Sequence, residues 1–398
     1  MANSTIVIGV ATAAVWIYLL FFRGGFWRLP NIQPPVTTNQ PSCSVVAVIP
    51  ARDEAEVICR SLASLLAQDH PGDLHIVVVD DHSSDGTAEV AREAATAAAA
   101  CERLTICAGK PVPPGWTGKL WAVQQGIEAA RARQPDHLLL TDADIVHDPR
   151  NLRELVARCE AGDYDLVSLL VKLHCHSWSE RLLIPAFAFF FLMLYPPRWV
   201  ADAARRISAA AGGCMLIRPA VLDRIGGIES IRHEIIDDCA LARRIKGVGT
   251  VWLGISAHTC STREYGSWRT IWDMVARTAF AQLRYSVGIL GFTLVMLAVT
   301  YLAPPLLLLS TDPIAMACGG AAWLGMSFAF LPMLKEYDVP RPLAVLLPGI
   351  ALFYAAATVA SAVLFWRGRG GHWKGRFQAV GAIASPRKRC EGKQRSGL

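Results

Sequence analysis

Short apolar runs alternate with amphipathic segments through the middle of the chain. Four runs have the length and β-branched content of buried strands: Val45–Ile49, Leu74–Val79, Leu138–Thr141 and Leu166–Leu170. Between the first three, apolar positions recur at helical spacing over Glu54–Ala67, Thr87–Ala100 and Leu120–Arg131. Because strands that alternate with helices pair in parallel, the pattern predicts an α/β domain with a mostly parallel sheet.

Longer apolar stretches flank this domain. The first, Ile6–Phe22, has nearly the roughly 20 residues of a spanning helix, and Arg23 and Arg28 follow it. A signal peptide is the competing interpretation, but its positive charges would precede the apolar run. Three more stretches of spanning length follow the domain: Val287–Leu309, Pro313–Leu334 and Leu343–Trp366. We therefore expect one N-terminal and about three C-terminal transmembrane helices.

These changes in composition divide the chain into a transmembrane anchor (1–28), a Pro-rich linker (29–43), an α/β domain (44–285), C-terminal transmembrane helices (286–366) and a basic tail (367–398). Within the domain, residues 182–197 are very apolar but contain Pro185 and end at two further prolines. This segment is short for a full crossing, so we expect it to lie at the membrane surface, with a buried core helix as the alternative.

Composition supports a membrane protein, because 53% of the 398 residues are hydrophobic and only 18% are charged. The basic tail suits anionic lipid headgroups, although a solvated end is equally compatible with it. Eleven cysteines without a CxxC pair indicate neither a disulfide framework nor a structural zinc site. One span before a cytoplasmic domain and three after it would place the tail outside, whereas its charge argues for the inside. The sequence leaves this conflict open.

Acidic residues follow two of the predicted strands. Asp80 and Asp81 follow Val77–Val79, at the edge where α/β sheets bind ligands, and their carboxylates can accept hydrogen bonds from a base or ribose. A capped helix start with Asp85 at the cap is the alternative. Asp142 and Asp144 follow the next strand, and alternate positions on extended backbone place both on one side. Such oxygen ligands suit Mg²⁺ or Mn²⁺, which neutralises a diphosphate.

A third acidic pair, Asp237 and Asp238, stands at the start of an amphipathic run. A carboxylate there can act as a general base, or the pair can simply favour the helix dipole. Upstream, Gly212 and Gly213 allow close approach of a substrate to the backbone, or mark a tight strand bend.

Taken in this order, the motifs resemble the family 2 glycosyltransferases of the GT-A type. The segment with Pro50, Arg52 and Glu54 looks like the opening strand and nucleotide-binding loop of that family, with Asp53 where Asn is usual. Asp80 and Asp81 match its base- and ribose-binding motif. Asp142-Ala143-Asp144 matches its metal-binding DxD, and Gly118-Lys119 its segment near the diphosphate.

By the same resemblance, Asp238 falls at the catalytic base, with Asp237 in place of the usual Glu, and His258 at the third metal ligand, although a structural histidine is nearly as compatible. Arg277 or Arg284 would reach the diphosphate, with a charge that flanks a membrane helix as the alternative. The nearest match to the Gln-x-x-Arg-Trp motif of processive members, at residues 282–285, has the wrong spacing, so polymer synthesis is not expected.

The full layout resembles bacterial hopene-associated glycosyltransferases and, more distantly, ceramide glucosyltransferases. This resemblance implies an inverting enzyme on the cytoplasmic face of a bacterial inner membrane. It would use a divalent metal, a nucleotide sugar (most simply a UDP-sugar) and a lipid acceptor, with no nucleic acid as partner. Two other classes stay open: a membrane nucleotidyl- or sugar-phosphate transferase with the same acids, and a non-catalytic scaffold with a transferase fold.

Overall fold

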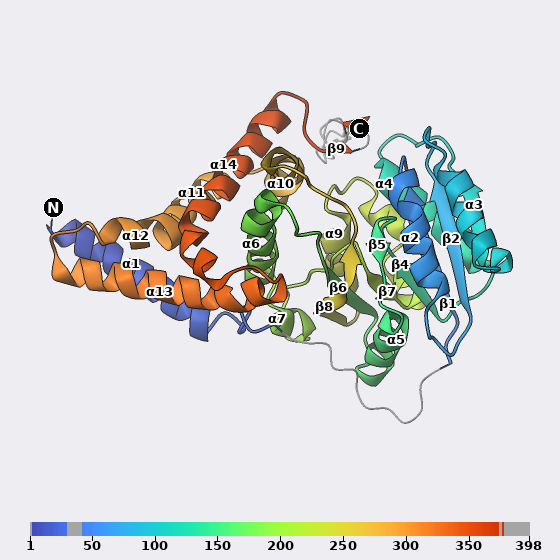
Figure 1. The fold of residues 1–398 in the computed structure, drawn as a ribbon, viewed down its shortest axis with the longest axis horizontal. Helices are drawn as coiled ribbons and strands as arrows, with labels where there is room; N and C mark the ends of the chain where they lie inside the picture. Colours follow the sequence, from blue (N-terminus) through green and yellow to red (C-terminus); the bar gives the residue numbers. More distant parts are fainter. Residues whose placement is uncertain (1, 30–41, 374–375, 378–398) are drawn as a thin grey trace, which may run out of the picture.

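An eight-stranded sheet forms the centre of the computed structural model, which describes residues 2–29, 42–373 and 376–377 (Figure 1). Most of the predicted linker and basic tail lie outside these residues. The strand order is β3-β2-β1-β4-β7-β6-β8-β5. The strands are β1 (Val45–Ala51), β2 (Leu74–Asp80), β3 (Leu104–Ala108), β4 (His137–Leu140), β5 (Ile145–Val146), β6 (Leu166–Lys172), β7 (Met215–Ile217) and β8 (Val251–Ser261).

The sheet is mostly parallel, as the sequence predicts. Strands β3, β2, β1 and β4 pair in parallel, as do β6 and β8, whereas β7 is antiparallel to both of its neighbours and β5 to β8. The four predicted strands correspond to β1, β2, β4 and β6. The prediction missed β3, β5, β7 and β8, of which β5 and β7 have only two and three residues.

Helices cover both faces of the sheet. The predicted helices appear as α2 (Ala55–Leu66), α3 (Thr87–Ala97) and α4 (Gly118–Arg131). Along β1, Val45, Ala47 and Ile49 pack in one core with α2, α3 and α5 (Asn151–Ala161), while Val46 and Val48 pack in the other with α4 and α9 (Asp237–Lys246). A strand buried on both faces is continuously apolar, which explains the runs that predicted these strands.

A third core belongs to the apolar helices. It includes buried residues of α1 (Ala2–Phe21), α6 (Trp178–Leu194), α10 (Trp268–Gln282), α13 (Pro313–Glu336) and α14 (Leu347–Trp366). A helix formed by α11 (Val287–Leu297), a π-helical turn (Ala298–Leu302) and α12 (Ala303–Leu307) completes the set. Five stretches are long and apolar enough to span a membrane: Ser4–Phe21, Trp178–Ala201, Val287–Leu307, Pro313–Glu336 and Arg341–Trp366. The predicted apolar helices at both ends of the chain are thus present.

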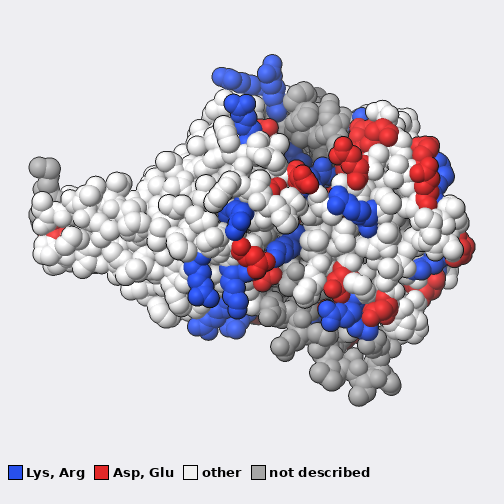
Figure 2. Space-filling view, viewed as in Figure 1, with Lys and Arg blue, Asp and Glu red and all other residues white. Residues whose placement is uncertain are grey.

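These helices fall into two groups in space. Helices α1, α11, α12 and α13 extend away from the sheet as an arm, with α1 and α12 packed against α13, whereas α14 runs across the direction of α13 and packs along α10 (Figure 1). The arm shows almost no charged side chains in Figure 2, and Lys and Arg residues gather where it meets the catalytic domain. Helix α6 packs against α10, α13 and α14, which fits the buried-helix alternative for this segment. Its contact with lipid stays a prediction.

Candidate active site

Two loops at the carboxyl ends of β1 and β2 are tied to each other. The side chain of Asp53, whose φ of 50° lies in the left-handed region, accepts a hydrogen bond from the Ser84 N–H at 2.8 Å. Asp85 accepts from the N–H groups of Ala55 at 2.9 Å and Thr87 at 3.1 Å, at the starts of α2 and α3. The N-cap of α3 is Gly86, so Asp85 is not the cap residue that the alternative interpretation expected. Asp85 instead joins the two loops, because it accepts from the first N–H group of each helix.

The predicted nucleotide-binding residues meet at this edge. Arg52 Nη1 donates to the carbonyl oxygen of Asp81 at 2.9 Å and lies 3.6 Å from its carboxylate. Asp81 is 2% exposed, while Asp80 is half-buried and accepts from the Ser83 N–H at 3.0 Å. Pro50, at the end of β1, lines a small cavity together with Lys119, Asp142, Gly212 and Asp237.

Lys119 connects two of the acidic motifs. It lies in the first turn of α4, where the Thr117 hydroxyl caps the helix by accepting from the Leu120 N–H. Its Nζ is 2.9 Å from Asp142 Oδ1 and 3.2 Å from Asp237 Oδ2. Burial acts to lower the pKa of Lys119, but the charges of Asp142, Asp237 and Asp238 prevail and raise it, so the side chain stays a cation.

Gly212 lies at the centre of this group. Its N–H donates to Asp238 Oδ2 at 2.9 Å, and the Cys239 N–H donates to Oδ1 at 2.6 Å. A Cβ on Gly212 would be 3.4 Å from Lys119 Nζ, 3.6 Å from Asp238 Oδ2 and 3.7 Å from Asp142 Oδ2. The three side chains therefore surround one glycine, whose missing side chain leaves the space between them open.

Asp238 has the electrostatic setting of a base that works near neutral pH. Burial raises its pKa to about 6, and the neighbouring charge of Asp237 adds to this, while Lys119 and the two backbone N–H donors act in the opposite direction. Burial also raises the pKa of Asp142 despite its contact with Lys119. A carboxylate with a pKa near 6 is a stronger proton acceptor than an exposed aspartate and is still ionised at pH 7.

Asp144 is held by residues that the sequence analysis missed. Its Oδ2 accepts from Ser261 Oγ at 2.6 Å and lies 3.3 Å from Arg263 Nε, while Arg263 Nη2 contacts both carboxylate oxygens of Glu54 at 2.8 and 2.9 Å. Arg263 thus links the DxD loop to the first nucleotide loop. In the sequence, Ser261 and Arg263 could have been found only as polar residues around the end of β8, and β8 itself was not predicted.

The DxD acids have the chemistry that a divalent cation needs. Lys119 contacts Oδ1 of Asp142, whereas Ser261 and Arg263 contact Oδ2 of Asp144. Within the described residues, Asp142 Oδ2 and Asp144 Oδ1 accept no side-chain hydrogen bond. One oxygen of each carboxylate thus remains available, and hard oxygen ligands suit Mg²⁺ or Mn²⁺. The two acids fit such an ion.

Two predicted site residues, His258 and Arg284, have no described contact with the site acids. His258 is exposed on β8, where its charge acts on Asp148 and Glu154. Within the described chain, His258 forms no three-residue group with Asp142 and Asp144 whose ligand atoms lie within 4.8 Å, so this structure gives its ligand role no support. Arg284 is exposed in the turn after α10, and no described ion pair joins it to a site acid.

Arg277 differs from Arg284 because its charge acts on Tyr265, a residue that the charges of Asp144 and Asp142 also affect. It is exposed on α10, and its charge acts on the Tyr265 hydroxyl together with those of Asp144 and Arg263. Arg277 therefore remains a candidate for contact with a phosphate.

Comparison with known proteins agrees with this geometry. The sequence profile of the family described as "Glycosyltransferase like family 2" matches residues 41–283, more than half of the chain. The probable glycosyltransferase YdaM of Bacillus subtilis (strain 168) is 23% identical over 283 residues. That match covers 68% of this chain but only 64% of YdaM, so the chain spans less than two thirds of the length of this relative.

Among solved structures, the fold is similar to that of the mannosyltransferase PcManGT from Pyrobaculum calidifontis, solved with GDP-Man and Mn²⁺. The TM-score is 0.54, the identity is 19%, and the match covers 92% of this chain and 98% of that chain. The family match and the shared fold lead to one conclusion: the chain belongs to glycosyltransferase-like family 2 and has the GT-A fold.

Proposed function

We propose that this enzyme transfers a sugar from a nucleotide diphosphate sugar to a hydroxyl group of a lipid, with inversion at the anomeric carbon. The observation that carries the proposal is the position of Asp238 beside Gly212 and Lys119, next to the apolar helices. Ala211, directly before Gly212, is buried in the same core as α6, α10 and α13. A lipid hydroxyl at the membrane surface would therefore be close to the base.

The donor would bind along the carboxyl ends of β1, β2 and β4. Asp80 and Asp81 would accept hydrogen bonds from the base and ribose, and Lys119 and Arg277 would bind the diphosphate. The sequence resemblance favours a UDP-sugar, whereas the similar mannosyltransferase was solved with GDP-Man, so both donor classes belong in the assay. A hopanoid acceptor rests on sequence resemblance alone.

In the reaction, the Asp238 carboxylate takes the proton of the acceptor hydroxyl as its oxygen attacks the anomeric carbon. The bond from that carbon to the diphosphate breaks, and the nucleoside diphosphate leaves from the opposite side, which inverts the configuration. Lys119 neutralises part of the charge on the departing diphosphate. A divalent cation held by Asp142 and Asp144 would neutralise the remainder.

The arm supports a specific orientation in the membrane. The 24 residues of α13 extend roughly 36 Å at 1.5 Å per residue, enough for the hydrocarbon core. At its far end, the loop between α12 and α13 carries one charged residue, Asp312, whereas Arg23, Arg28 and Lys335 stand at its near end. By the positive-inside rule, the near end and the catalytic domain lie in the cytoplasm of a bacterial cell, at its inner membrane.

In this arrangement α1, α11–α12 and α13 cross the membrane, and α14 lies with α6 and α10 beside the catalytic domain. The C-terminal tail then lies on the cytoplasmic side. An even number of crossings after the domain removes the conflict between span number and tail charge.

The first prediction concerns the base. Asp238→Asn should reduce transfer by about 10²- to 10⁴-fold, because an amide cannot accept the proton, while affinity for the donor stays within a few-fold of wild type. The assay combines purified full-length protein, labelled UDP- and GDP-sugars, a divalent metal and bacterial lipid extract, and measures labelled lipid. Asp223→Asn, at an exposed position, is the matched control. Normal turnover in Asp238→Asn would disprove the base assignment.

The second prediction concerns pH. Because only ionised Asp238 accepts a proton, kcat/KM should rise with pH through about 6 in the wild type, two pH units above the range of an ordinary aspartate. Lys119→Met removes a charge that lowers the pKa of Asp238. The acidic limb of the kcat/KM profile of this variant should therefore lie at higher pH than that of the wild type, whatever rate remains. An acidic limb near pH 4 in both proteins would contradict the proposed setting of Asp238.

The third prediction concerns the metal. A chelator should abolish transfer, and Mn²⁺ or Mg²⁺ should restore it. Asp144→Asn should raise the half-saturating metal concentration by at least about tenfold, because it removes one charged ligand. Asp148→Asn, four residues along the chain, is the control. An unchanged metal titration in Asp144→Asn would exclude Asp144 as a ligand.

The fourth prediction concerns topology. A green fluorescent protein fused to the C-terminus should fluoresce in cells, and alkaline phosphatase fused there should be inactive, because the tail lies in the cytoplasm. The same reporters fused after Thr311, at the far end of the arm, should give the opposite result. Active phosphatase at the C-terminus would mean that α14 crosses the membrane.

A further inference from the structure

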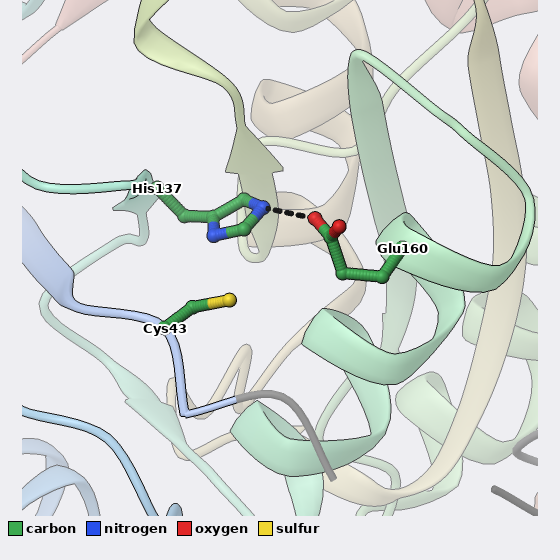
Figure 3. Close-up of side chains that lie close together, drawn as sticks. All are labelled: Cys43, His137 and Glu160. Atoms are coloured by element: carbon green, nitrogen blue, oxygen red, sulfur yellow. Dashed lines mark ion pairs between the residues drawn. The ribbon is translucent and has the colours of Figure 1, made fainter. Parts of the chain in front are cut away.

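A second cluster of potential metal ligands lies at the amino ends of β1 and β4, opposite the ends of these strands that carry the active site. Cys43 precedes β1 by two residues, His137 is the first residue of β4, and Glu160 lies near the end of α5. Their side chains point toward one another in Figure 3, and one ligand atom from each lies within 4.8 Å of the others. This is the one such group of three among the residues that the structure describes, and it is separate from Asp142 and Asp144.

His137 is the most informative member, because it is 2% exposed and incompletely paired. Its Nε2 lies 3.1 Å from Glu160 Oε1, but the contact lacks hydrogen-bond geometry, and in the described chain Nδ1 has no hydrogen-bond partner. A buried ring nitrogen without a partner is costly, and coordination would remove that cost.

Cys43 is held in place by its backbone. Its carbonyl oxygen accepts a hydrogen bond from His70 Nε2 at 2.7 Å, and a Cβ on Gly72 would lie 2.0 Å from that oxygen. The next residue, Ser44, donates through its N–H to Asp136 at 2.7 Å. The backbone at Cys43 is therefore held without help from a ligand.

We propose that Cys43, His137 and Glu160 bind a zinc ion. Sulfur, nitrogen and carboxylate oxygen are the ligands of protein zinc sites, whereas Mg²⁺ and Mn²⁺ prefer oxygen alone. Binding forms a bond from zinc to the Cys43 sulfur and releases the thiol proton to solvent. Glu160 is 38% exposed, which leaves room for water as a fourth ligand. Arg218 lies 3.0 Å from the same Glu160 oxygen and competes with the ion.

The zinc would have a structural role. It would join Cys43, where the chain enters the catalytic domain, to β4 and α5, which are distant in sequence. The active site lies at the other ends of β1 and β4, so glycosyl transfer should not depend directly on this ion.

The test uses the full-length protein in detergent, with Zn²⁺ content measured after removal of excess metal and Co²⁺ as a spectroscopic probe. We expect one zinc per chain and a thiolate-to-cobalt charge-transfer band, both lost in Cys43→Ser and retained in Cys59→Ser, an exposed cysteine on α2. A zinc-specific chelator should lower the Tm of the wild type and leave that of Cys43→Ser unchanged.

Two outcomes would overturn the proposal. If Cys43→Ser binds Co²⁺ as the wild type does, the thiol is not a ligand. If the wild type takes up no zinc, the cluster is only an ion pair beside a thiol. Should Cys43→Ser fail to fold, Glu160→Gln decides: it changes a partly exposed side chain, and it should weaken zinc binding while metal-dependent glycosyl transfer persists. Unchanged zinc affinity in that variant would also reject the site.

Discussion

The ion pairs of Lys119 hold the active site together. The carboxylates of Asp142, Asp237 and Asp238 lie close to Lys119, and like charges so near one another disfavour ionisation. The ammonium group of Lys119 offsets this repulsion at 2.9 and 3.2 Å from two of them. Its position depends on α4, which packs so closely on β1 that a Cβ on Gly126 would lie 2.3 Å from Val48 Cγ1. The packing of one helix on the sheet therefore places the charge on which the acids depend.

The same region joins the catalytic domain to the apolar helices. Ala211 packs in the core of the helices, and the next residue, Gly212, donates to Asp238. On the other side of the site, Arg263 ties Asp144 to Glu54, and Glu180 at the start of α6 accepts from the Tyr265 N–H at 2.7 Å. Backbone and side-chain contacts thus connect the loops that carry Glu54 and Asp144 to α6.

The two proposed metal sites lie at opposite ends of the same strands: one would take part in the reaction, and the other would stabilise the fold. The carboxyl ends of the strands carry oxygen ligands beside the base, where a hard cation would contact a diphosphate. The opposite ends carry sulfur and imidazole beside the point where the chain enters the domain. Since the two ligand sets differ in softness, each would select a different ion.

The sequence alone determined the elements whose signal is local. Strands β1, β2, β4 and β6 were predictable because they are continuously apolar, and Asp80, Asp81, Asp142 and Asp144 because they follow such strands directly. Strands β5 and β7 are too short for a periodic signal. Strand β8 was not predicted either, so Ser261 at its end and Arg263 just beyond it, which contact Asp144, could not be located. Only the tertiary structure decided that the charge of His258 acts on Asp148, that α14 packs along α10, and that Cys43 meets His137 and Glu160. Contacts between residues about a hundred positions apart depend on strand order and helix packing, which no local pattern contains.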